Sequence, residues 1–179
     1  MKTKSAINNI KNILEAARWC FLNFGYGKTS MEDVAKRANV SRALIYKKFK
    51  NKEEIALGVF DILLTPDYKK TDKIAAGRES KEARLMQICQ IMALEPWAAM
   101  AGAPMAEEFL KICELIEPQS CTLHEKKLLE YSSKILGKKE SAQVFVLALY
   151  GLQADVPPAE VLEKRVKTLV RAFTSANNI

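Results

Sequence analysis

The sequence predicts an all-α fold in which a three-helix amino-terminal domain precedes a larger helical bundle, with about nine helices in total. Apolar residues recur at intervals of three and four over nearly the whole chain, which is the spacing of one helix face. No segment alternates apolar and polar residues between hairpin turns, so we expect no strands. With 49% hydrophobic and 27% charged residues, the 179-residue chain can form an ordinary globular core.

The first expected helix is about twenty residues long and carries one apolar stripe. It ends at Gly25-Tyr26-Gly27, because glycine readily adopts the left-handed conformation that stops a helix. The stripe consists of Ile10, Ile13, Leu14, Ala17, Phe21 and Phe24.

A short second helix is expected to begin after Ser30. Ser30 and Asp33 have the three-residue spacing of a capping pair at a helix start. Asn39-Val40 then forms a tight turn, since Asn tolerates the left-handed conformation better than most non-glycine residues. The apolar side of this helix is formed by Met31, Val34, Ala35 and Ala38.

Ser41 caps a third helix, Arg42 to Phe49, in which Ile45 and Phe49 are expected to face inward. Two helices of this length joined by a three- or four-residue turn form a helix-turn-helix. Its outer side suits the major groove of DNA, because Arg can bond guanine while Ala and Tyr can contact a thymine methyl or a phosphate. That outer side carries Arg42, Ala43, Tyr46 and Lys47, with Lys48 beside them.

A fourth helix, residues 51–64, is expected to link the two parts of the chain, which are residues 1–50 and 51–179. Asn51 and Glu54 repeat the capping spacing. Lys52 stands in the first turn, where a cation is unfavourable for the helix dipole unless a phosphate lies nearby.

The net charge of +7 is concentrated near the amino terminus. Residues 1–60 contain twelve Lys and Arg against five Asp and Glu, whereas residues 61–179 contain sixteen of each sign. This asymmetry favours a polyanion partner for the first third of the chain.

The remaining helices are expected after a break at Leu64-Thr65-Pro66-Asp67. Prolines and Gly137 mark their starts and stops. They are predicted near residues 79–94, 104–116, 120–136, 140–154 and 158–175.

Residues 7 to about 60 resemble the DNA-binding domain of TetR-type regulators. The similar strings are Thr29 to Ala35, Val40 to Arg42, and Tyr46 to Glu54, while Asn39 stands where the family usually has glycine. The resemblance implies a regulator, most commonly a repressor, that binds an inverted-repeat operator in double-stranded DNA as a homodimer. It further implies release from DNA by a small-molecule effector.

The same resemblance assigns roles to the matched residues. Thr29, Ser30, Tyr46 and Lys52 would hold DNA phosphates. Arg42, Ala43 and Lys47 would face base edges, and Lys48 would contact a phosphate or a base. We count Ser41, the cap of the third helix, with this DNA-binding set.

The last two helices are the expected dimer interface, in agreement with the family resemblance. Residues 144–152 are apolar on all sides, which suits a helix buried between its own core and a partner. Alternatively, the apolar residues of both helices pack only in the core of the monomer. The predicted interface residues are Val144, Leu147, Ala148, Gly151, Leu152, Leu162, Val166, Leu169 and Phe173.

The middle helices are expected to hold an apolar or aromatic effector, as the resemblance implies. Methionine and aromatic residues at helical spacing are also typical of a plain core, so that alternative remains open. The candidate pocket residues are Met86, Cys89, Met92, Trp97, Met100, Met105, Phe109 and Cys113.

Nothing in the sequence indicates an enzyme, a cofactor or a metal site. It contains one histidine, no glycine-rich phosphate loop and no paired cysteines with zinc spacing. Without an export signal or a long apolar run, we expect a cytoplasmic protein that does not cross a membrane. Two alternatives remain: a DNA-binding regulator without a ligand, and a membrane-surface or protein-interaction module that uses the first helix.

Overall fold

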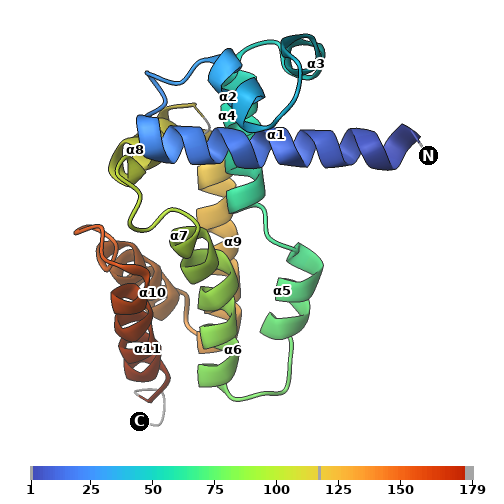
Figure 1. The fold of residues 1–179 in the computed structure, drawn as a ribbon. Coiled ribbons are helices and arrows are strands. Elements are labelled where there is room, and N and C mark those ends of the chain that lie inside the picture. The colour runs from blue at the N-terminus through green and yellow to red at the C-terminus, as the bar shows by residue number, and fades with distance from the viewer. Residues whose placement is uncertain (1, 117, 176–179) are drawn as a thin grey trace. The chain divides into compact units, whose positions relative to one another are not determined.

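The computed structural model describes residues 2–116 and 118–175, and their regular structure is entirely helical (Figure 1). The all-α prediction is confirmed. The chain divides into two compact units: unit 1 is Met1–Leu63 with Ala103–Pro118, and unit 2 is Leu64–Gly102 with Gln119–Ile179. These packing units differ from the functional division after residue 50, which stays a prediction, because the linking helix and residues 103–118 pack with the helix-turn-helix.

Unit 1 contains four consecutive helices and a fifth from later in the chain. They are α1 (Lys2–Phe24), α2 (Met31–Arg37), α3 (Arg42–Lys48), α4 (Lys52–Leu64, whose last residue belongs to unit 2) and α8 (Ala106–Ile116).

The middle of the α1 stripe forms the core of unit 1. Ile13, Leu14, Ala17 and Phe21 are buried, whereas Ile10 and Phe24 at the ends of the stripe are exposed. Burying four apolar side chains of one helix is what holds that helix against its neighbours, since each contributes about 1 to 3 kcal/mol.

Helix α4 crosses α1 at close range. A Cβ atom on Gly58 would lie 2.8 Å from Cδ2 of Leu14, so any larger residue at position 58 would force the Leu14 side chain to move. Helix α8 joins the same core through Phe109, whose ring centroid lies 4.9 Å from that of Phe60. The chain before α8 is also tied to α1, because Met105 N donates to the Leu22 carbonyl oxygen at 3.0 Å.

Unit 2 contains the remaining helices. They are α5 (Tyr68–Ala75), α6 (Lys81–Cys89), the π-helix η1 (Gln90–Leu94), α7 (Glu95–Ala98), α9 (Pro118–Leu136, of which residues from Gln119 on belong to this unit), α10 (Lys139–Gly151) and α11 (Ala159–Ser175). Helix α6 contacts both α5 and α11, and α10 packs on α11.

Buried polar side chains of α9 fix its neighbours within unit 2. The two ring nitrogens of His124 lie 2.9 Å from the Leu64 carbonyl oxygen and 2.8 Å from that of Met92. Further along α9, Tyr131 OH donates to Asp72 Oδ1 at 2.9 Å and accepts from the Thr71 hydroxyl at 3.0 Å. These bonds satisfy polar groups that would be costly to bury unpaired.

The described residues form more helices than the nine expected. The polar stretch after residue 66 contains the short helix α5, which the sequence pattern did not indicate. The helix predicted at 79–94 continues through the π-helix η1 into α7, and π-helical turns are often found at functional sites.

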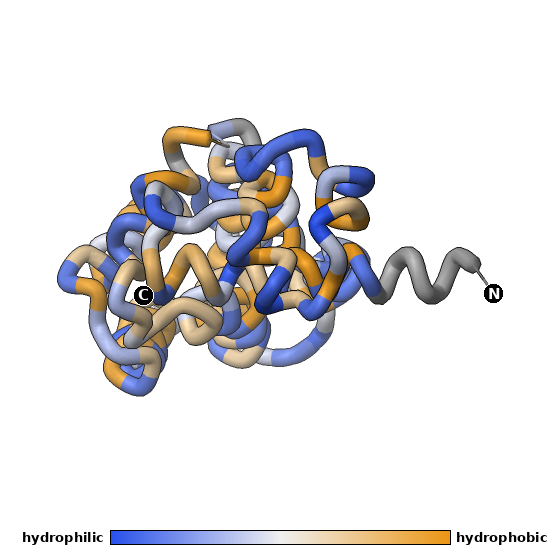
Figure 2. Tube along the Cα trace, turned by 45° about the horizontal axis from the view of Figure 1, so that its top comes forward, coloured by the Kyte–Doolittle hydropathy of each residue, from blue (hydrophilic) through white to orange (hydrophobic). Residues whose placement is uncertain are grey.

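The described helices combine hydrophilic and hydrophobic residues. Figure 2 shows hydrophilic and hydrophobic residues alternating at short intervals along the trace. Among the described residues, no helix is long and apolar enough to cross a bilayer.

Candidate nucleic-acid interface

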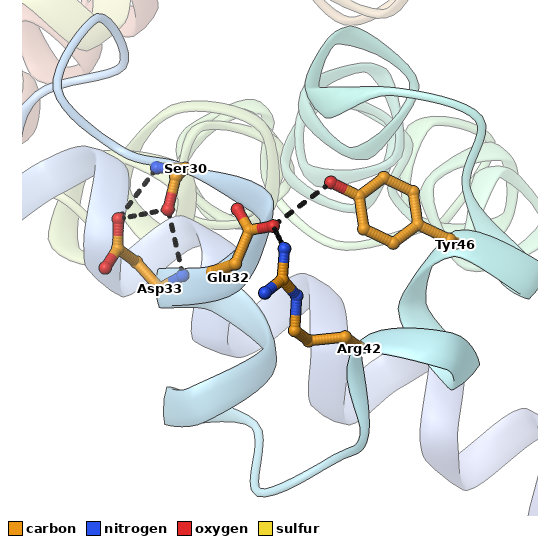
Figure 3. Close-up of polar contacts among 5 residues, drawn as sticks. All are labelled: Ser30, Glu32, Asp33, Arg42 and Tyr46. Atoms are coloured by element: carbon orange, nitrogen blue, oxygen red, sulfur yellow. Dashed lines mark hydrogen bonds and ion pairs between the residues drawn. The ribbon is translucent and has the colours of Figure 1, made fainter.

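Helix α2 begins with a complete capping box (Figure 3). Asp33 N donates to Ser30 Oγ at 3.1 Å, and Ser30 N donates to Asp33 Oδ2 at 2.9 Å. The Ser30 hydroxyl also donates to Asp33 Oδ2, at 2.6 Å. These hydrogen bonds from Ser30 lower the pKa of the Asp33 carboxyl. The capping prediction is confirmed, and it fixes where α2 starts.

The turn between α2 and α3 has the conformation that the sequence indicates. Asn39 has a φ of 52°, in the left-handed region. Val40 N donates to the Ala35 carbonyl oxygen at 3.0 Å, and the Asn12 side chain donates to the Ala38 carbonyl oxygen at 2.7 Å. The turn is therefore closed by its own backbone and is also bound to α1.

Helix α3, the expected recognition helix, has one buried and one exposed side. Ser41 Oγ accepts from Leu44 N at 3.1 Å, so Ser41 caps the helix as predicted. Ile45 and Phe49 are buried, as expected. The opposite side exposes Ser41, Arg42, Ala43, Tyr46 and Lys47, and Lys48 is half-buried. The predicted DNA-reading side chains thus share a solvent-exposed face.

Glu32 contacts two residues of this face, a relationship that the sequence analysis missed. Its Oε1 atom accepts from Arg42 Nη2 and lies 3.4 Å from the Tyr46 hydroxyl (Figure 3). Glu32 stands in the first turn of α2. An acidic residue there also suits the helix dipole, so the sequence offers no signal that singles out its contact with α3.

Thr29 has a structural position in the turn between α1 and α2. Its side chain is buried, with the residue 2% exposed, and its hydroxyl donates to the Gly25 carbonyl oxygen at 2.8 Å. The hydroxyl proton is therefore used inside the protein. This contradicts the expectation of a phosphate contact from the Thr29 side chain, and the structure assigns the residue to the turn.

Lys52 is bound to the same turn. Its Nζ donates to the carbonyl oxygens of Tyr26 at 2.6 Å and Thr29 at 2.8 Å, and it lies 4.4 Å from the centroid of the Tyr26 ring. Partial burial lowers the pKa of the Lys52 ammonium group. These bonds explain a lysine at the start of α4 without DNA, and a phosphate contact remains a prediction.

Glu108 of α8 holds the turn from another side. Tyr26 N donates to Glu108 Oε1 at 3.1 Å. The neighbouring Glu107 instead pairs with Lys111 Nζ at 2.7 Å. Lys52 and Glu108 together place a cation and an anion on the backbone of one short loop, immediately before the start of α2.

The predicted pocket residues are divided between the two units. Met105, Phe109 and Cys113 belong to unit 1, where Phe109 packs on Phe60. The other five, Met86, Cys89, Met92, Trp97 and Met100, belong to unit 2.

Two of the pocket candidates in unit 2, Trp97 and Cys89, are accounted for by packing and hydrogen bonding within that unit. Trp97 Nε1 donates to the Pro157 carbonyl oxygen at 2.9 Å, which satisfies the buried indole. Cys89 is fully buried, and this burial raises the pKa of its thiol to about 12. Neither arrangement needs a ligand, so the pocket remains a prediction.

Unit 2 also contains an open groove of about 450 Å³ at the surface. None of the predicted pocket residues lines it. Its lining residues are Lys126, Leu129, Glu130, Ser133, Lys134 and Lys139.

The predicted dimer residues differ in their exposure to solvent. Leu162 and Val166 are 0% exposed and form part of the core of unit 2, so their assignment to a dimer surface is wrong. Val144 and Leu147 are 56% and 70% exposed, on the outer side of α10. The remaining candidates are the exposed Gly151 and the half-buried Ala148, Leu152, Leu169 and Phe173. Phe173 packs edge-on against Phe145.

The exposed face of α10 includes an aromatic residue that the sequence analysis omitted. Tyr150 is exposed on the same helix as Val144 and Leu147. We define the exposed face of α10 as Val144, Leu147, Tyr150 and Gly151.

Comparison with known families gives a match over residues 13–59, to the model described as bacterial regulatory proteins, tetR family. The amino-terminal domain belongs to the TetR family. The matched TetR-type domain contains α2, α3 and their capping residues, together with Glu32, Lys52 and the turn that Lys52 binds.

Two curated relatives are similar over part of the chain. The uncharacterized HTH-type transcriptional regulator YhgD of Bacillus subtilis is 47% identical over 68 residues, which is 38% of this chain and 36% of YhgD. The HTH-type transcriptional regulator TtgR of Pseudomonas putida is 34% identical over 70 residues, or 39% of this chain and 31% of TtgR. The match thus spans about a third of the length of each relative.

A solved structure resembles the whole fold. SmeT, the repressor of the Stenotrophomonas maltophilia multidrug efflux pump SmeDEF, has a TM-score of 0.66 at 17% identity, covering 93% of this chain and 89% of SmeT. The SmeT–triclosan complex has the same TM-score and identity, with 95% and 91% covered. At this identity, the likeness concerns the fold.

Proposed function

We propose that the protein is a sequence-specific transcription regulator that binds double-stranded DNA as a homodimer. The observation that carries this proposal is the exposed side of α3, where Arg42, Ala43, Tyr46 and Lys47 lie together in a TetR-type domain. Such a helix fits the major groove with its amino-terminal residues at the base edges. A regulator of this kind would work in the cytoplasm.

The DNA contacts follow from the position of each side chain on the recognition helix. Arg42 and Ala43 stand in its first turn, where base contacts are made. Lys47 extends the same face, and Tyr46 and Lys48 would hold phosphates. Ser30 would add a phosphate contact at the start of α2, where the helix dipole favours an anion. Ser30 is half-buried rather than enclosed like Thr29, and its hydroxyl would have to leave Asp33 to donate to the phosphate.

The exposed face of α10 supports a homodimer. Val144 and Leu147 leave large apolar side chains in water on one helix, and burying them against a second copy would be favourable. Two copies related by a twofold axis would present two recognition helices, which calls for an inverted-repeat operator.

An apolar or aromatic small molecule would release the repressor from its operator. The fold likeness to SmeT, which has been solved with triclosan, supports looking for such a ligand in unit 2. The half-buried Met86 and Met100, like the buried Met92 and Trp97, belong to unit 2, and methionine supplies adaptable apolar surface. Release requires that the effector bind the DNA-free state more tightly than the bound state.

A regulator without a ligand is the second candidate, because Trp97 and Cys89 are accounted for by packing within unit 2. A membrane-surface module is less well supported, since the middle of the α1 stripe is buried. The TetR family is a family of DNA-binding regulators, and we propose no catalytic role.

Selection from random duplexes, followed by binding measurements at several salt concentrations, tests the proposal. We expect an inverted repeat to be enriched and the affinity to fall steeply with salt. Failure to bind any duplex at low salt would refute DNA binding. A thermal-shift screen of apolar compounds, scored by release of the selected duplex, separates the ligand-controlled regulator from the ligand-free one.

A further inference from the structure

We propose that Glu32 is a specificity-determining residue, which holds Arg42 in position for a base edge and keeps it from unrelated phosphates. This inference rests on the proposed DNA-binding function. Glu32 is not one of the expected DNA contacts, and its carboxylate would be repelled by phosphates. Its position against the recognition helix therefore calls for another role.

One carboxylate oxygen organises two residues of the DNA-reading face. Arg42 and Tyr46 are four residues apart on α3, so they lie one turn apart on the same side. Glu32 Oε1 accepts from Arg42 Nη2 and lies 3.4 Å from the Tyr46 hydroxyl, across the gap between α2 and α3 (Figure 3). The contact joins the two helices of the motif at the surface that would meet DNA.

The helix that carries the Glu32 carboxylate is held firmly in place. Helix α2 is fixed at its start by the capping box of Ser30 and Asp33, and its inner side is anchored by buried residues that include Met31 and Val34. A backbone hydrogen bond at the helix start and the nearby Arg42 guanidinium lower the pKa of Glu32, which is thus ionised at neutral pH. Arg42, by contrast, stands on a long stem and is largely exposed.

A guanidinium held at one nitrogen keeps its other N–H donors in a defined plane. Guanine offers O6 and N7 in the plane of the base, and it suits such a preoriented group. To reach a phosphate elsewhere, Arg42 would have to leave Glu32, and the uncompensated carboxylate would then face the polyanion. Arg42 therefore adds little to the affinity for unrelated DNA, whereas it contributes its full base contact to the affinity for the operator.

Lys47 and Lys48 provide the contrast. Among the residues that the structure describes, neither has a carboxylate partner. Both are free to attract any DNA backbone, which is how sequence-independent affinity arises. The face thus combines unrestrained lysines for general attraction with a restrained arginine for base recognition.

The test compares Glu32→Gln with Glu53→Gln, using the full chain. Gln keeps the size and the acceptor oxygen of Glu32 but removes its charge. Glu53 is an exposed carboxylate in the first turn of α4, so Glu53→Gln removes one charge from the same unit without freeing Arg42. The affinities for the selected operator and for an unrelated duplex are measured over a range of salt concentrations.

For Glu32→Gln we expect affinity for the unrelated duplex to rise about 5- to 10-fold, with a salt slope steeper by about one, because Arg42 can then neutralise one more phosphate. Operator affinity should stay close to that of the wild type, so the ratio of specific to unrelated affinity falls by about fivefold or more. Glu53→Gln should leave this ratio unchanged. In an Arg42→Ala background, Glu32→Gln should change the ratio no more than Glu53→Gln does.

Melting temperatures show whether each variant is folded. A folding defect is unexpected, because Glu53 is exposed and the Glu32 side chain is 39% exposed. The inference is wrong if Glu32→Gln keeps the wild-type affinity ratio and salt slope. It is also wrong if Glu32→Gln changes the ratio as much in the Arg42→Ala background as in the wild type. In either case, operator binding by the wild type still supports the proposed function. If the wild type binds no duplex, both the inference about Glu32 and the proposed function are wrong.

Discussion

The ammonium group of Lys52 donates a hydrogen bond to the carbonyl oxygen of Tyr26, 2.6 Å away. A second bond reaches the carbonyl oxygen of Thr29, so α4 begins by closing the loop that leads into α2. A basic residue that resembles a phosphate ligand in sequence thus stabilises the DNA-binding domain itself. The two roles make different predictions.

Lys52→Met should lower the stability of unit 1 by about 1 kcal/mol, because two carbonyl oxygens lose a charged donor at a partly solvated site. Thermal unfolding measures this loss. The salt slope of DNA binding should remain near that of the wild type if the loop is the main partner of Lys52. A slope flatter by about one would instead show a phosphate contact.

Asp33→Asn should reduce the acid sensitivity of the domain. Hydrogen bonds from Ser30 lower the Asp33 pKa below its ordinary value of 3.8, so the folded state favours the ionised carboxylate. The stabilisation is present above pH 3.8 and is lost as the pH falls through the lower folded-state value. The free energy of unfolding, measured at a series of pH values from neutral to strongly acidic, should therefore fall less steeply for the variant. Identical curves would contradict this role.

Arg42→Ala should weaken operator binding by about 1 to 3 kcal/mol and relax the base preference at one position in each half-site. Repeating the duplex selection with the variant measures both effects. Lys47→Ala provides a comparison on the same face. An unchanged preference at every position would contradict base recognition by Arg42.

Leu147→Glu should prevent dimer formation and leave the fold of unit 2 intact, because the side chain is 70% exposed and the new carboxylate would be buried at the interface. Sedimentation analysis and melting curves measure the two properties. Leu115→Glu is the matched control, since Leu115 is 76% exposed on α8, outside the proposed interface. A dimeric Leu147→Glu variant would exclude this face.

The helix-turn-helix could be predicted closely because its signals are local. The capping residues Ser30 and Ser41 and the turn residue Asn39 each act within a few positions of the chain. Burial of Ile45 and Phe49 follows from their spacing. Such features depend little on how distant elements pack.

The partners of polar side chains could not be predicted in the same way. Thr29 and Lys52 are bound to backbone carbonyl oxygens, and Glu32 is bound to Arg42, through contacts that depend on how helices cross. A hydroxyl, an ammonium group or a carboxylate bonds equally well with several kinds of partner. The residue type alone does not choose among them.

The interface on α10 was predicted only in part because its helix is apolar on every side. Periodicity cannot then tell which residues face the core. On neighbouring α11 the apolar stripe is clear, but its spacing does not tell whether it packs on the core or on a partner, and Leu162 and Val166 lie entirely inside. The helix α5 was missed for the opposite reason. Its polar composition resembles a loop, and its burial depends on Thr71, which bonds to Tyr131 of α9.

The loop at Gly25 restricts how relatives of this protein can diverge. Gly25 has a φ of +88°, and a Cβ atom there would lie 3.1 Å from both carboxylate oxygens of Glu108. A side chain at position 25 is thus opposed both by the backbone and by a residue more than eighty positions away, whose carboxylate also binds Tyr26 N. Homologues that replace glycine here should carry a shorter residue at position 108, so that the two positions evolve as a pair.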